Sequence, residues 1–134
     1  MANQVIMVDT SILIDYFRKK DKSKTRLYVL SQQSIILCIS SITEFEIYTG
    51  AKGEQINFWK AMLSNFIVFP FNSETALVAV EIQNKLKRHR KSIDKADLFI
   101  AATAIAHDVH FDTLNHKHFE NIEDLKMTKS GTTN

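Results

Sequence analysis

Side chains with oxygen ligands recur at four separate places in this sequence. Asp9 ends the apolar run of residues 5–8, Glu46 and Asp97 stand in amphipathic stretches, and Thr113-Leu114-Asn115 lies near the end. Carboxylate and amide oxygens are the ligands that Mg²⁺ prefers in proteins. Because these residues are far apart in the chain, they predict a divalent-cation site that the fold has to bring together.

Short β-branched runs alternate with amphipathic stretches, which is typical of βαβ units and predicts an α/β fold with a parallel sheet. Strands are predicted over residues 4–9, 35–39, 66–69 and 108–112. Helices are predicted over residues 11–17, 24–33, 42–49, 54–64, 73–90 and 95–107. Ligands of such sheets gather outside the carboxyl ends of the strands, so the sheet can bring together Asp9 and residues 112–115.

Asp97 falls in the first turn of the helix predicted over residues 95–107, where its carboxylate can point toward the same edge of the sheet. Asp94 lies three residues earlier. There it can cap the free N–H groups of the helix, with Asp97 as its N3 partner, for about 1 kcal/mol of stability. Both roles are compatible, with Asp94 capping the helix and Asp97 binding the ligand.

Glu44 and Glu46 compete for one place in the site. Two residues that are two positions apart differ by about 200° around a helix and cannot share a face. Glu46 shares its face with Thr43 before it and with Gly50 after it. This pattern favours Glu46, while a role as a solvent-facing acid stays open for either residue.

Length and composition predict one globular domain over residues 1–128, followed by a flexible polar tail over residues 129–134. The first residues lack a basic region and Asp9 interrupts the apolar run. We therefore expect neither a signal peptide nor a membrane helix, but a cytoplasmic protein without a membrane partner. The single cysteine, Cys38, lies in an apolar run, where we expect a buried and inert thiol.

Basic side chains are concentrated in two stretches, with six of the 17 in residues 18–26 and five in residues 85–91. Cations beside an acidic site fit a phosphodiester substrate, because they hold the backbone while a metal ion acts on it. The alternative is that each stretch is a solvated helix end, where lysine and arginine favourably meet the helix dipole. For the second stretch both interpretations stay open.

Four motifs in the right order and spacing resemble the PIN domain family, and specifically its VapC-type toxin ribonucleases. They cover nearly the whole chain: Val8-Asp9-Thr10-Ser11, Ser41-Ile42-Thr43 with Glu46 and Gly50, Asp97-Leu98-Phe99-Ile100-Ala101-Ala102-Thr103-Ala104, and Thr113-Leu114-Asn115 with His118-Phe119. The resemblance implies an α/β/α sandwich around a mostly parallel sheet of four to five strands. It also selects Glu46, since the family's acid stands three residues after the threonine.

The resemblance implies a toxin that hydrolyses RNA phosphodiester bonds, of transfer RNA or ribosomal RNA, with a water activated by Mg²⁺ or Mn²⁺. The residues that match the family's metal-binding acids are Asp9, Glu46 and Asp97. Asn115 stands at the fourth acidic position, where many members have aspartate. Residues expected to support the site are Thr10, Ser11, Thr113, Asp94 and Asp112.

Asparagine at position 115 keeps a carbonyl oxygen but carries no charge, so a second metal ion would be held less tightly. Asp112 can substitute only if it faces the site, and the alternation of side chains along a strand argues against that. Four histidines near the last strand offer zinc ligands or acid–base groups instead, but their spacing argues against convergence on one metal ion. They are His107, His110, His116 and His118. For His118 we expect a structural hydrogen bond.

The resemblance also implies partners, namely a second copy in a homodimer and a VapB-like antitoxin whose C-terminal segment lies across the acidic site. An apolar surface for them can come from residues 47–62, although the same side chains would be ordinary core in a monomer. These are Ile47, Tyr48, Phe58, Trp59 and Met62. We expect other aromatic residues, such as Phe45, to serve as core or interface.

Other function classes are tested by single positions. A haloacid-dehalogenase phosphotransferase needs a second aspartate two residues after Asp9, where this chain has Ser11. A response-regulator receiver needs an aspartate at the end of the third strand, and residues 68–71 contain none. A catalytically weak PIN fold that binds RNA or serves as a scaffold predicts loss of the acids, of which three remain.

Overall fold

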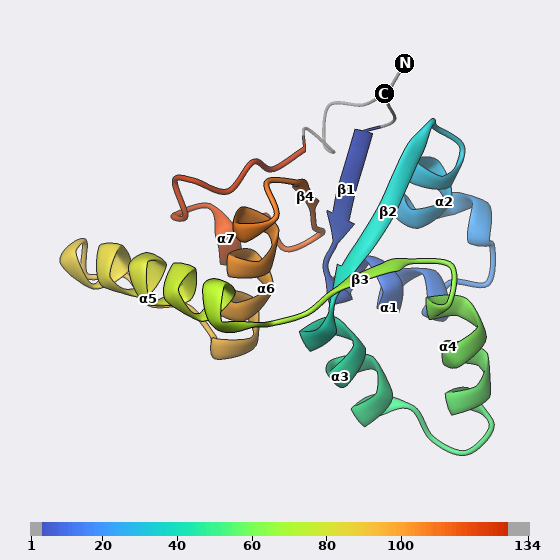
Figure 1. The fold of residues 1–134 in the computed structure, drawn as a ribbon. Helices are drawn as coiled ribbons and strands as arrows, with labels where there is room; N and C mark the ends of the chain where they lie inside the picture. Colours follow the sequence, from blue (N-terminus) through green and yellow to red (C-terminus); the bar gives the residue numbers. More distant parts are fainter. Residues whose placement is uncertain (1–3, 129–134) are drawn as a thin grey trace.

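Four parallel strands form the centre of the structure, a computed structural model that describes residues 4–128. The strands are β1 (Gln4–Val8), β2 (Ile35–Ser40), β3 (Ile67–Phe69) and β4 (His110–Asp112). They lie in the order β3-β2-β1-β4, and every pairing is parallel (Figure 1). This confirms the predicted α/β class with a parallel sheet. The tail predicted over residues 129–134 lies outside the described residues.

Helices fill the connections between the strands. They are α1 (Thr10–Arg18), α2 (Arg26–Ser31), α3 (Ser41–Gly50), α4 (Gln55–Leu63), α5 (Ser73–Arg88), α6 (Lys95–Ala106) and α7 (His116–Phe119), with a 3-10 turn η1 (Lys22–Lys24) before α2. All six predicted helices are present within a few residues, except that the one predicted over residues 24–33 is wrong in its first turn. Thr25 interrupts it, because the Thr25 side chain accepts a hydrogen bond from the Tyr28 backbone N–H and begins α2 there.

One predicted strand and one predicted helix are shorter in the structure, because a residue near the end of each has a left-handed backbone conformation. The strand predicted over residues 108–112 begins only at His110, because Asp108 has a φ of 53°, in the left-handed region that a strand does not use. Likewise α5 ends at Arg88 rather than at Arg90, whose φ is 58°. The short helix α7 was not predicted, since four residues are too few to show a helical period.

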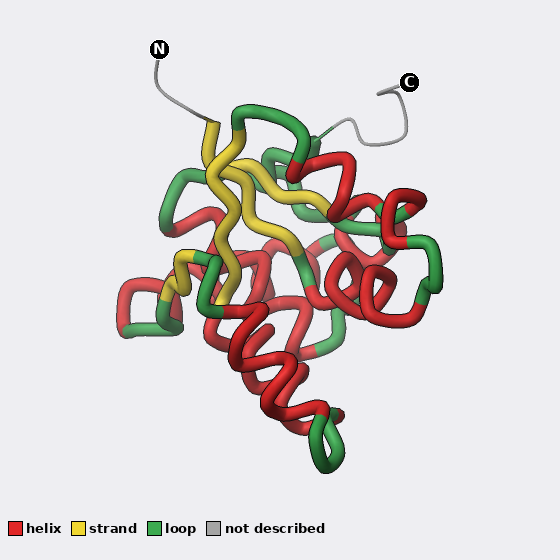
Figure 2. Tube along the Cα trace, turned by 90° about the vertical axis from the view of Figure 1, so that its right-hand side faces the viewer, coloured by secondary structure: helices red, strands yellow, loops and turns green. Residues whose placement is uncertain are grey.

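Helices cover both faces of the sheet, as the alternation of side chains along β1 requires. Met7 packs with the apolar side chains of α5, α6 and α7, including Phe119. Ile6 and Val8 point to the opposite face and pack with α1, α2, α3 and α4, including Trp59. The result is the three-layer α/β/α sandwich that the family resemblance implied. Figure 2 views it from the side of α2 and α4 and shows the four strands next to one another.

The apolar residues proposed as a partner surface divide between core and surface. Ile47 and Trp59 are buried, with 2% and 3% of their surface exposed, so for these two residues the alternative of ordinary core is confirmed. Phe58 is 41% exposed, and Phe45, on α3, is 68% exposed and so is not core. Within the described residues, no helix is long and apolar enough to cross a membrane.

The carboxyl ends of β1, β2 and β4 meet at one edge of the sheet, which is where the site residues lie. Asp9 follows β1 directly and is the N-cap of α1, and α3 follows β2 without a loop. The Asp9 backbone N–H donates to the Asp112 carbonyl at 3.1 Å, which ties the start of α1 to the end of β4. This edge therefore brings together residues more than 100 positions apart, such as Ser11 and Thr113.

Candidate active site

Asp9 is the buried centre of the site, with 4% of its surface exposed. One carboxylate oxygen, Oδ1, accepts hydrogen bonds from the Ser11 backbone N–H at 2.9 Å and from the Ser11 hydroxyl. The other, Oδ2, accepts from the Thr113 hydroxyl at 2.6 Å. Burial raises the pKa of Asp9, and these hydrogen bonds partly oppose the rise. The carboxylate is thus fixed in one orientation, in surroundings where a nearby cation would favour its charged form.

The two hydroxyls that hold Asp9 also fix the loop after β4. Ser11 Oγ accepts a hydrogen bond from the Leu114 backbone N–H at 3.1 Å, and Thr113 Oγ1 accepts one from the Asn115 N–H at 2.9 Å. Each hydroxyl therefore donates to the carboxylate and accepts from the loop. In this arrangement Ser11 and Thr113 occupy supporting positions around Asp9.

Glu46 reaches the site from α3, and its orientation comes from a chain of hydroxyls. Thr10 Oγ1 donates to Glu46 Oε1 at 2.5 Å and lies 3.3 Å from Thr43 Oγ1. Thr10 has one hydroxyl proton, so it can donate to Glu46 or to buried Thr43, and the shorter contact is the one to Glu46. Glu46 lines the same cavity as Asp9, whereas Glu44, on another face of α3, does not.

Asp97 lies in the first turn of α6, with 22% of its side chain exposed. Burial raises the pKa of Asp97, the His118 ring beside it lowers the pKa, and the neighbouring carboxylates of Asp94 and Asp9 raise it again. The like charges of these acids disfavour one another's ionisation. A cation between them would relieve the repulsion.

His118 contacts this acid directly, with Nδ1 3.1 Å from Asp97 Oδ2. A structural hydrogen bond was predicted for His118, but its partner is a carboxylate of the site rather than a packing contact. The signal that sequence reasoning lacked was α7, because this short helix turns His118 toward α6 three residues after Asn115. The imidazole can orient the carboxylate through this hydrogen bond.

The three remaining candidate residues lie in different surroundings. Asp94 is the N-cap residue of α6 but makes no side-chain capping hydrogen bond, so the capping prediction is wrong. Its side chain lines the cavity of the site instead. Asn115 begins α7, also without a side-chain capping bond, and lines the same cavity. Asp112 is fully buried and bound to Arg26, so its carboxylate is not a substitute at the fourth acidic position.

The cavity that these residues share has a volume of about 820 Å³. It also receives Arg18 and Lys19, from the far end of α1, which places part of the first basic stretch beside the acids. Its polar lining consists of Asp9, Thr10, Ser11, Asp15, Arg18, Lys19, Glu46, Asp94, Asp97, Asn115 and His118.

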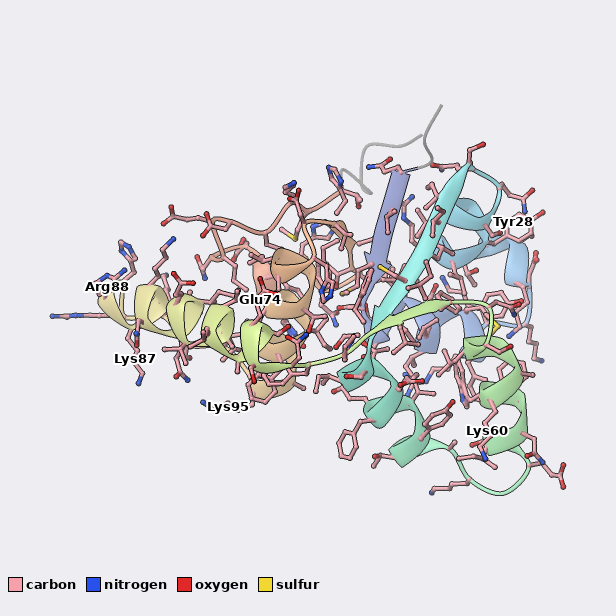
Figure 3. The ribbon with its side chains drawn as sticks, viewed as in Figure 1. Tyr28, Lys60, Glu74, Lys87, Arg88 and Lys95 are labelled. Carbon is pink, nitrogen blue, oxygen red and sulfur yellow. The ribbon has the colours of Figure 1, made fainter. Side chains whose placement is uncertain are left out.

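The second basic stretch has different surroundings. Figure 3 shows Lys87 and Arg88 at the end of α5, which projects away from the sheet. Lys85 forms an ion pair of 2.9 Å with Asp124, and it lines a separate cavity of about 340 Å³ together with Lys91 and three acids. The acids offset the positive charge there. This stretch therefore fits a solvated helix end better than a phosphate-binding surface.

The oxygen donors that line the cavity around Asp9 fit a divalent cation, with water completing its coordination. Within residues 4–128, no three side chains of histidine, cysteine, aspartate or glutamate are close enough to hold a metal ion by themselves. Mg²⁺ commonly binds through one or two carboxylates and keeps several waters, so a complete protein cage is not required. Asp97 and Glu46 each use one carboxylate oxygen in the hydrogen bonds described above, which leaves the other for an ion or its waters.

Comparison with known proteins places this arrangement in a family. The family model of the PIN domain matches residues 6–125. Ribonuclease VapC1 of Methanocaldococcus jannaschii is 37% identical over 126 residues, which cover 91% of this chain and 84% of that protein.

Solved structures give the same result. VapBC-1 from nontypeable Haemophilus influenzae has a TM-score of 0.82 at 25% identity, covering 96% of this chain and 100% of that one. A toxin-antitoxin complex from Klebsiella pneumoniae has a TM-score of 0.75 at 28% identity, covering 93% of this chain and 97% of that one. The chain therefore belongs to the PIN domain family, and within it to the group of the VapC proteins.

Proposed function

We propose that the chain is the toxin of a toxin–antitoxin pair, a metal-dependent endoribonuclease that hydrolyses RNA phosphodiester bonds. The observation that carries the proposal is the convergence of Asp9, Glu46 and Asp97 on one cavity that also contains Arg18. The relative from Methanocaldococcus jannaschii is named a ribonuclease, which supports the same reaction.

The residues would divide the work as follows. Asp9, Glu46 and Asp97 would hold Mg²⁺ or Mn²⁺ together with bound water, with Asn115 as a neutral oxygen donor beside them. When bound, such an ion lowers the pKa of a water and offsets charge on the phosphate. Ser11 and Thr113 keep Asp9 in place through their hydrogen bonds to its two oxygens. Thr10 does the same for one oxygen of Glu46.

The substrate would be bound through its phosphates at the end of α1. Lys19 is already paired with Asp15 at 3.0 Å, whereas Arg18 has no ion pair with the described residues and is free to meet a phosphate. Phosphate contacts carry no information about sugar or base. The proposal that the substrate is RNA therefore rests on the relative's name, which is that of a ribonuclease. Transfer RNA and ribosomal RNA are the substrates to test first.

The partners in this proposal are a VapB-like antitoxin and a second copy of the chain, both in the cytoplasm. The similar structure from Klebsiella pneumoniae is described as a toxin-antitoxin complex, which supports the first partner. For the homodimer, exposed apolar side chains are available on α3 and α5. They are Phe45, Leu77 and Val80, which are 68%, 69% and 52% exposed.

The test is cleavage of total cellular RNA by the purified protein with Mg²⁺, with Mn²⁺ and with EDTA. We expect discrete cuts that need the metal and that disappear in Asp9→Asn and Asp97→Asn. Glu44→Gln is a matched control for Glu46→Gln, because both acids lie on α3 and only Glu46 lines the cavity. A folded wild-type protein that binds RNA without cutting it would instead support the alternative of a catalytically weak binding or scaffolding module.

A further inference from the structure

We propose that Arg26 is a positioning residue for Asp9 and acts on it through Asp112 and Thr113. The proposal rests on the proposed function, because it concerns the geometry of the same acid. Arg26 belongs to the first basic stretch, where a role in phosphate binding was considered. Its guanidinium faces the interior instead, with 10% of the side chain exposed.

The contact between Arg26 and Asp112 is a buried, forked ion pair. Arg26 Nη2 lies 2.8 Å from Asp112 Oδ2, and Arg26 Nε lies 3.2 Å from each carboxylate oxygen. Thr128 Oγ1 donates a further hydrogen bond to Asp112 Oδ2 at 2.6 Å. The Asp112 side chain has no exposed surface, so these partners replace the water that would otherwise solvate its carboxylate. A planar guanidinium that meets both oxygens fixes the direction of the carboxylate as well as its distance.

Asp112 and the residue after it are joined to Asp9 in two ways. The Asp112 carbonyl accepts the hydrogen bond from the Asp9 backbone N–H at 3.1 Å. The next residue, Thr113, donates its hydroxyl to Asp9 Oδ2 at 2.6 Å. One ion pair therefore holds the two-residue segment that sets both the backbone and the carboxylate of the central acid.

The position of this segment in the sheet explains why an ion pair that fixes it is useful. Strand β4 has three residues, lies at an edge of the sheet, and pairs with β1 on one side only, apart from a single bridge between Phe111 and Met127. A short edge strand has few ladder hydrogen bonds to fix its end. Arg26, at the start of α2, supplies an additional link from the helical layer on one face of the sheet.

The first test compares Arg26→Lys and the double variant Arg26→Met/Asp112→Leu with wild type. The double variant removes both charges, so no buried charge is left unpaired and the protein is expected to fold. Lys85→Met is the control, since it breaks an exposed ion pair of similar length, Lys85 to Asp124, away from the acids. Residues that orient metal ligands typically contribute 10- to 100-fold to affinity or activity.

We expect kcat to fall about 10- to 100-fold in both Arg26 variants, with KM for RNA unchanged, because the guanidinium faces Asp112 rather than the cavity. Thr113→Val should lose activity to a similar extent, and adding it to Arg26→Met/Asp112→Leu should cost little more, because the two act in series. Unchanged kcat per folded molecule would overturn the proposal. A raised KM with unchanged kcat would also overturn it, and would assign Arg26 to phosphate binding.

Two readouts do not depend on cleavage. Mn²⁺ affinity, measured calorimetrically without RNA, should fall in the Arg26 variants and stay at the wild-type value in Lys85→Met. Hydrogen exchange should become faster at the Asp9 N–H, whose acceptor is Asp112, and at the Asn115 N–H, whose acceptor is Thr113. If wild type cuts no RNA, the proposed function fails, and the exchange of these two amides still decides whether Arg26 positions the segment. Unaltered exchange would contradict the proposal.

Discussion

Burial and neighbouring like charges disfavour the ionised form of acids in the site, and this lowers the stability of the folded protein. Asp97 has a raised pKa, first because it is partly buried and also because Asp94 and Asp9 lie near it. Between its ordinary pKa and the raised value, the folded protein binds a proton that the unfolded chain has lost. The free energy of unfolding contributed by this residue therefore falls as the pH rises through that interval.

Asp97→Asn should accordingly melt at a higher temperature than wild type in EDTA at pH 7, because asparagine carries no buried charge. The difference should shrink as the pH is lowered toward the ordinary pKa of aspartate, about 3.9. Adding Mg²⁺ should raise the melting temperature of wild type more than that of Asp97→Asn. Thermal unfolding followed by circular dichroism measures all three effects, and a difference that stays constant with pH would contradict the assignment.

The two glutamates of α3 give a second prediction at this scale. Glu46→Gln should lower kcat by at least about 10²-fold, comparable to the loss of a group that stabilises transition-state charge. Glu44→Gln should stay within about twofold of wild type, since Glu44 does not line the cavity. Single-turnover cleavage of one labelled RNA measures both. Equal losses in the two variants would contradict the assignment of Glu46, rather than Glu44, to the site.

At the scale of elements, the first basic stretch divides into residues with different roles. Arg18 faces the cavity and Arg26 is buried against Asp112. Lys22 lies between them in sequence, and its Nζ donates to the carbonyls of Tyr16, Phe17 and Lys19 at 2.5, 3.0 and 2.8 Å. These carbonyls end α1, so Lys22 closes the helix that begins with Asp9.

Lys22→Met should therefore lower the free energy of unfolding by about 1.5–3 kcal/mol, the range for hydrogen bonds to charged groups. Lys20→Met is the matched control, because Lys20 is an exposed lysine in the same segment with no hydrogen bond to the described residues. Urea denaturation of the two variants gives the comparison. Equal stabilities would mean that the carbonyls of α1 are satisfied as well by water.

Strand β2 allows a test of the sheet itself. Cys38 lies in β2 between β1 and β3, is completely buried, and has a pKa raised to about 12 by burial. Only the thiolate reacts with disulfide reagents, so the native thiol should not react at pH 8 except through opening of the sheet. Its labelling rate should rise with urea in parallel with unfolding. Rapid labelling without denaturant would contradict a buried β2.

For the whole molecule, the sequence predicts what is periodic or local and misses what is short or distant. Strands and helices were found because their apolar residues repeat. Asp9 and Asp97 were found because they stand at a strand end and in a first helical turn, and Glu46 because of its spacing from Thr43. Helix α7 escaped prediction, and with it the approach of His118 to Asp97. The ion pair of Arg26 and Asp112 joins residues 86 positions apart, and no periodicity indicates such a pair.

The distribution of charge over the molecule predicts where an RNA substrate would lie. Arg18 lines the acidic cavity, whereas Arg88 is on the end of α5, away from the sheet (Figure 3). If Arg18 holds one phosphate of a single strand, Arg18→Ala should make the plot of log kcat/KM against log salt concentration less steep by about 0.7. Arg88→Ala should leave the slope unchanged. Equal changes in both would mean that RNA follows α5 as well, and a change in Arg88→Ala alone would place the substrate on the other basic stretch.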